Sequence, residues 1–81
     1  MRDEDIADRV KAIIGETLEL DEDWIWPESR IFEDLCADPM DFAILLSNLE
    51  LAFDIQIGDA ALYGVDTVED LTRTVTAALK G

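Results

Sequence analysis

The side chains best suited to covalent chemistry lie between Cys36 and Ser47. Cys36 is the single cysteine of the chain, Asp38 supplies a carboxylate directly before Pro39, and Ser47 supplies a hydroxyl. A thiol can take up an acyl group as a thioester, but acids surround Cys36 in the sequence and no base stands near it to activate the thiol. We therefore expect Cys36 to be a small, buried or half-buried hydrophobic residue, with direct acylation of its thiol as the alternative.

Asp38 and Pro39 also form a helix-start signal. A carboxylate at this position can accept hydrogen bonds from the free N–H groups of a first helical turn, and proline at the first helical position loses no hydrogen bond. The apolar spacing that follows predicts a helix over residues 39–53. The Asp-Pro step therefore has a structural explanation that needs no chemistry.

Several kinds of enzyme site have no counterpart in the sequence. The chain has no His, so imidazole catalysis and His metal ligation are absent. The acidic segment 21–33 has neither the central Gly nor the spacing of acids that a calcium loop needs. Gly-rich phosphate loops and nucleophile elbows are missing too, and we expect a non-enzymatic protein without a metal site.

Composition predicts a single domain over residues 1–81 with unusual charge. The chain is 49% hydrophobic and carries 20 acidic against 6 basic residues, a formal net charge of −14. Nucleic acids and anionic membranes would repel it, and salt should stabilise it. One Cys allows no internal disulfide, and the first residues resemble neither a signal peptide nor a membrane span. We expect a cytoplasmic protein whose partners present basic surfaces.

Helical spacing of apolar residues predicts four helices, and the fold class is therefore a small all-α, four-helix bundle. The first helix follows Asp3 or Asp5 as a cap and reaches Leu18, and the second spans 39–53. A short third helix lies at 59–63, and the last runs from a Thr67/Asp70 capping box to Gly81 with Val68, Leu71, Val75, Ala78 and Leu79 on one face. Between the first two helices we expect a long ordered loop, held by Ile25, Ile31, Phe32 and Leu35.

Trp24 and Trp26 flank Ile25 in this loop. If the segment is extended and buries Ile25, both indoles point to the opposite side. They either cover the edge of the bundle or form an aromatic contact surface.

The helix at 39–53 is apolar on two opposite faces. A helical wheel gathers one set in a broad sector, which we expect in the core: Phe42, Leu45, Leu46, Leu49 and Phe53. Met40, Ile44 and Leu51 cluster opposite, around Ser47 and with acids on the flanks. Either neighbouring helices enclose this second face, or it is an exposed apolar ridge of the kind that contacts another protein.

Four segments together resemble the acyl carrier proteins of bacterial type II fatty-acid and polyketide synthesis. They are "RVKAIIGETL", "FEDLCADPMD", "LELAFDIQI" and "VDTVEDL", in the family's order and spacing over nearly the whole chain. The resemblance implies a small, acidic four-helix bundle with a long first loop and a short third helix. Family members carry 4′-phosphopantetheine on the Ser of a Gly-x-Asp-Ser-Leu motif at the start of the second helix.

This chain departs from that motif at the attachment position itself. It reads Cys36-Ala37-Asp38-Pro39-Met40, so Pro39 stands where the resemblance places the serine, and Cys36 where the family commonly has Gly. Proline has no hydroxyl on which a phosphodiester can form. Ser47 lies roughly 12 Å along the helix, outside the family's motif. We expect no prosthetic group.

The resemblance also implies docking of the second helix on basic residues of a biosynthetic enzyme. Ile44 and Leu51 stand where the family commonly places acids, which shifts recognition toward apolar burial. The expected partner-binding residues are Asp38, Met40, Asp41, Ile44, Ser47, Glu50 and Leu51. Our hypothesis is an unmodified, carrier-like interaction protein, a monomer or weak homodimer. The alternative is a working acyl carrier that uses Cys36 or holds an acyl ligand non-covalently.

Overall fold

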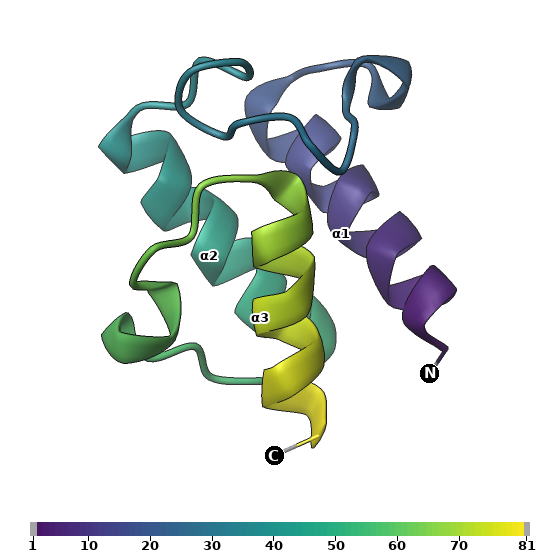
Figure 1. The fold of residues 1–81 in the computed structure, drawn as a ribbon, viewed down its shortest axis with the longest axis vertical. Helices are drawn as coiled ribbons and strands as arrows, with labels where there is room; N and C mark the ends of the chain where they lie inside the picture. The colour runs from purple at the N-terminus through teal and green to yellow at the C-terminus, as the bar shows by residue number, and fades with distance from the viewer. Residues whose placement is uncertain (1, 81) are drawn as a thin grey trace.

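The computed structural model describes residues 2–80, and its regular elements within that range are all helical. The elements are α1 (Asp3–Leu18), the 3₁₀ turn η1 (Glu22–Trp24), α2 (Pro39–Phe53), the 3₁₀ turn η2 (Asp59–Leu62) and α3 (Val68–Lys80). This confirms the predicted all-α fold, with the short third helix present as a 3₁₀ turn. The three α-helices surround a common interior, and the loop between α1 and α2 crosses one end of the bundle (Figure 1).

The core draws on all three α-helices and on the long loop. Among the described residues the buried apolar side chains are Ile6, Val10, Ile13, Ile14, Ile25, Ile31, Leu35, Ala37, Leu45, Leu49, Phe53, Val68, Leu71 and Val75. The loop residues Ile25, Ile31 and Leu35 are among them, which confirms that the loop is an ordered part of the domain. Phe32 is 40% exposed, but its ring packs against Phe42 with the ring centroids 5.1 Å apart, so it also helps to hold the loop. Leu79, which the spacing places on the apolar face of the last helix, is 40% exposed.

The start of the first helix differs from the prediction. Asp3 and Asp5 lie inside α1, and its N-cap is Arg2, which makes no side-chain capping bond within the described residues, so the expected Asp cap was wrong. Because α1 already begins at Asp3, both aspartates are helical residues rather than caps. Gly81, the expected end of the last helix, lies outside the described residues.

The loop turns back on α1 at Gly15. Leu20 donates a hydrogen bond from its N–H to the Gly15 carbonyl, at 2.9 Å. A Cβ at position 15 would lie 2.9 Å from the Leu20 carbonyl oxygen, too close for any other residue. Gly15 therefore permits the close approach with which the long loop begins.

The loop is attached to the start of α3 by backbone hydrogen bonds. Ile31 donates to the Asp66 carbonyl at 2.8 Å, Val68 to the Ser29 carbonyl at 3.0 Å, and Glu69 to the Pro27 carbonyl at 2.8 Å. The bonds from Val68 and Glu69 satisfy free N–H groups in the first turn of α3. They also fix the loop across the end of the bundle.

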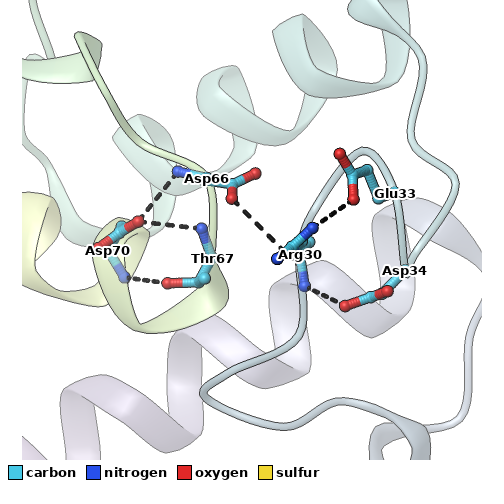
Figure 2. Close-up of polar contacts among 6 residues, drawn as sticks. All are labelled: Arg30, Glu33, Asp34, Asp66, Thr67 and Asp70. Carbon is cyan, nitrogen blue, oxygen red and sulfur yellow. Dashed lines mark hydrogen bonds and ion pairs between the residues drawn. The ribbon is translucent and has the colours of Figure 1, made fainter.

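Side chains strengthen the same attachment, as Figure 2 shows. Arg30 pairs with Glu33 and reaches Asp66, with Nε 3.9 Å from Oδ2. Thr67 and Asp70 form the predicted capping box: Asp70 N–H donates to Thr67 Oγ1 and Thr67 N–H to Asp70 Oδ2, both at 3.1 Å. The hydrogen bond and charge of Glu33 raise the pKa of Arg30.

Candidate functional site

The start of α2 is built by a reciprocal capping box. Asp41 donates its N–H to Asp38 Oδ1 at 2.7 Å, and Asp38 donates its N–H to Asp41 Oδ2 at 3.3 Å. Asp38 is the N-cap and Pro39 occupies the first helical position. The predicted helix start and the predicted bounds of the helix are both confirmed.

Pro39 is exposed at this helix start. Its ring is saturated and carries no nucleophilic atom, so the position offers surface shape and no covalent chemistry. The adjacent carboxylates of Asp38 and Asp41 are each held by a backbone N–H of the other residue. The head of α2 is thus a well-formed helix N-terminus without a group that could carry a covalent ligand at position 39.

Cys36 is exposed, and its expected burial was wrong. Its φ angle is 59°, in the left-handed region that glycine adopts without strain. With this backbone the side chain projects away from the core, while Ala37 beside it is buried. The turn thus places a thiol at the surface, where the sequence suggested a small core residue.

Met40, Ile44 and Leu51 form an exposed row on α2, which we call the α2 ridge. Their exposed fractions are 72%, 49% and 79%, so the neighbouring helices do not enclose this face. Ser47, between them along the helix, is exposed as well. The opposite face carries the buried residues Leu45, Leu49 and Phe53, with Phe42 and Leu46 packed partly buried against them. Of the two interpretations left open by the sequence, the structure supports the exposed ridge.

Two of the acids expected to flank the ridge also hold the fold together. Glu50 is half-buried, and its Oε2 accepts a hydrogen bond from the Ile57 N–H at 2.8 Å, which fastens the connector after α2. Asp41 is half-buried in the capping box. Sequence alone did not indicate the Glu50–Ile57 contact, because seven residues and a helix end separate its partners.

Leu51 stands between two surface grooves. A groove of about 580 Å³ lies toward α1 and includes Arg9, Ile13 and Asn48 in its lining. A wider groove of about 980 Å³ lies toward the connector after α2 and includes Asp54 and Ile57. Leu51 lines both grooves, so this exposed apolar side chain has a groove on either side.

Other kinds of site find no support in the described residues. Across residues 2–80 no group of three or more His, Cys, Asp or Glu side chains is arranged to hold a metal ion. Over the same range, no helix has the length and apolar character needed to cross a membrane.

Comparisons with known proteins define the class to which this helical bundle belongs. Residues 8–75 match the family described as "Phosphopantetheine attachment site". The chain is also 34% identical to an acyl carrier protein of Thermotoga maritima over 76 residues, which cover 94% of each chain. The chain therefore belongs to the acyl carrier protein family, as its sequence segments suggested.

The residues at the start of α2 do not fit the prosthetic group of that family. Attachment of phosphopantetheine as a phosphodiester needs an alcohol, and the residue at the first position of α2 is Pro39. The exposed Ser47 hydroxyl lies on the ridge, further along the helix than the capping box. The helix N-terminus that would favour a phosphate is present, but the oxygen that would bind it covalently is not.

Proposed function

We propose that this protein is a non-enzymatic, carrier-like interaction module that is not phosphopantetheinylated. It binds a biosynthetic enzyme, of the fatty-acid or polyketide type, through the α2 ridge. The observation that carries the proposal is Pro39 at the head of a fully formed α2, next to an intact Asp38–Asp41 capping box. The scaffold of the family is kept, and the position for the prosthetic arm has lost its alcohol.

The ridge and its surroundings indicate the chemistry of the partner. Leu51 and Met40 expose most of their apolar surface, and burial of such side chains contributes to binding about 25 cal/mol per Å² removed from water. The formal charge of −14 favours a partner with a basic rim. A protein surface with an apolar pocket bordered by Arg or Lys fits both properties.

The loss of modification is tested by intact mass after incubation with a broad-range phosphopantetheinyl transferase and coenzyme A. We expect no change for the native chain and a gain of one phosphopantetheine arm for the variant Pro39→Ser. The variant is a matched control because it restores one hydroxyl at an exposed position and leaves Asp38 and Asp41 in place.

Each other outcome contradicts part of the proposal. A mass gain by the native chain would show that another side chain accepts the arm. No gain by Pro39→Ser would show that more than the missing alcohol separates this chain from modifiable carriers. An acyl group on native protein that hydroxylamine removes, and that is absent in Cys36→Ser, would favour a working carrier that uses the exposed Cys36 thiol.

The docking face is tested by Ile44→Glu with Ala77→Glu as control. Both variants add one carboxylate at an exposed helical position, the first on the α2 ridge and the second on α3. We expect the partner protein to be retained by the immobilised native chain and by Ala77→Glu, but not by Ile44→Glu. The unfolding midpoints of both variants should stay close to the native value. Unfolding of Ile44→Glu, or equal retention by both variants, would reject the ridge as the docking face.

A further inference from the structure

The loop between α1 and α2 exposes two tryptophans on a surface separate from the α2 ridge. The exposed fractions are 73% for Trp24 and 59% for Trp26, whereas Ile25 between them is 1% exposed. Tryptophan is usually well buried in single domains, and it is enriched at protein–protein contacts. Such exposure leaves the indoles covering little of the bundle edge, so we favour the contact surface of the two earlier interpretations.

The backbone that presents the indoles is held by local hydrogen bonds. Trp24 donates its N–H to the Asp21 carbonyl at 2.9 Å, and Ile25 donates to the Glu22 carbonyl at 3.0 Å. Trp26 donates to Ser29 Oγ at 3.0 Å, and the Ser29 N–H returns a bond to the Trp26 carbonyl at 3.0 Å. With Ile25 anchored in the core, the segment is already ordered, and binding would cost little further conformational entropy.

A small groove adjoins Trp26. Its volume is about 260 Å³, its lining includes the buried Ile25 and Val68 together with Trp26 and Pro27, and Asp8 and Lys11 of α1 border it. This volume suits one aliphatic side chain of another protein. Trp26 is therefore one wall of an apolar hollow beside an exposed aromatic pair.

The charges around the indoles are mostly acidic. The neighbours in sequence are Asp21, Glu22, Asp23 and Glu28, and no Lys or Arg occurs between Lys11 and Arg30. An arginine of a partner would gain both from these carboxylates and from stacking on an indole face. A second copy of this chain would bring its own charge of −14 and the same acids, so self-association through this surface is disfavoured.

We propose that Trp24, Trp26 and the adjoining groove are a second docking surface, which binds a basic, arginine-bearing segment of a partner protein. A guanidinium stacks on an indole, and a neighbouring aliphatic side chain enters the groove. The proposal uses none of the residues of the α2 ridge, so it stands or falls independently of the function proposed above.

The test measures binding of two fluorescently labelled peptides by anisotropy at moderate salt. One alternates Arg and Leu, and the other is identical except for Lys in place of each Arg. Attraction by net charge alone treats the two alike, whereas stacking on tryptophan favours Arg. We expect the native chain to bind the Arg peptide about twofold to fivefold more tightly than the Lys peptide, as an exposed cation–π contact implies.

Variants locate that preference on the protein. Trp24→Ala/Trp26→Ala should lose the Arg preference, and Trp24→Phe/Trp26→Phe, which keeps aromatic faces, should retain part of it. Tyr63→Ala removes another exposed aromatic side chain, from beside η2, and should leave the preference unchanged. Circular dichroism checks that each variant remains folded.

Three results would overturn the proposal. Equal affinity of the native chain for the two peptides would leave only net-charge attraction. An Arg preference that survives in Trp24→Ala/Trp26→Ala would place the contact elsewhere. A dimer in sedimentation velocity that disappears in the same variant would show that a second copy occupies the surface.

Discussion

The two faces of α2 carry similar apolar side chains, but one face is buried and the other is exposed. Leu49 is fully buried, and Leu51, two residues further along the same helix, is 79% exposed. Leu45 is buried and the adjacent Ile44 is half exposed. The difference lies in what surrounds the helix, because α1 and α3 pack against one side of α2 and cover nothing on the other.

This contrast shows how one helix can stabilise a domain and offer a binding surface at the same time. A leucine or isoleucine contributes to folding only where it leaves water, by about 1.5–3 kcal/mol for a full side chain. On the ridge the same side chains remain in water, so most of that free energy is gained only when a partner buries them. Variants on the two faces, and at the contacts that orient them, test this division.

The largest effect should separate Leu49→Ala from Leu51→Ala. We expect the first variant to lower the free energy of unfolding by about 2–5 kcal/mol, since it opens a cavity in the core. The second should change it by no more than about 0.5 kcal/mol, as is usual for an exposed position. Urea unfolding followed by circular dichroism measures both, and comparable losses would show that the ridge is part of the core.

A smaller loss should follow from Asp38→Ala at the head of α2. The variant removes the carboxylate that accepts the Asp41 N–H, and loss of an N-cap costs about 1 kcal/mol. Asp59→Ala, at the start of η2, serves as a control that removes the same charge from another exposed position. Equal stabilities of the two variants in urea would mean that the capping box does not fix the start of α2.

A gain in stability should follow from Cys36→Gly. Glycine adopts a φ angle of 59° without the strain of a side chain, and after the larger unfolded-state entropy of glycine the net gain should be about 0.5–1 kcal/mol. Cys36→Ala removes the thiol but keeps the strain, so its stability should stay near the native value. If alanine stabilises as much as glycine, the thiol rather than the backbone is the unfavourable feature.

The smallest effect concerns Asp70, which caps the start of α3, where the long loop is attached. Hydrogen bonds from the backbone N–H groups of Thr67 and Asp66 lower the pKa of Asp70 below its ordinary value of 3.8. Its charged form therefore stabilises the fold fully above that ordinary pKa, and the contribution is lost as the pH falls through the lower, folded pKa.

Thermal midpoints of the native chain and Asp70→Asn test this. The native protein should be the more stable at neutral pH, and the difference should shrink as the pH is lowered below 3.8. Asp59→Asn controls for the relief of charge repulsion in so acidic a chain. A difference between native and Asp70→Asn that stays constant over this range would contradict the role of the charge.

Features set by neighbouring residues could be predicted from the sequence. The bounds of α2, its Asp38 cap, the capping box of Thr67 and Asp70, and the burial of Leu45 and Leu49 follow from helix chemistry and helical spacing. The same local logic identified both faces of α2, whereas the missing hydroxyl at Pro39 was recognised through the resemblance to the family motif. It did not reveal η1, which forms without a sustained apolar period.

Other features depended on how the elements meet. The exposure of Cys36 accompanies the left-handed turn that the loop makes before α2. The contact between Glu50 and the Ile57 N–H needed the connector to fold back beside α2. The Glu50 contact has no local signal, because it joins segments whose distance only packing defines.

The amino-acid sequence by itself determined the three α-helices, the caps of α2 and α3, the acidic charge and the absence of an alcohol at Pro39, since these depend on covalent structure and on contacts within a few residues. Tertiary structure alone decided which apolar face of α2 is buried and that both tryptophans stand in solvent. Burial depends on which surfaces remain uncovered after the helices and the loop have packed, and no single segment contains that information.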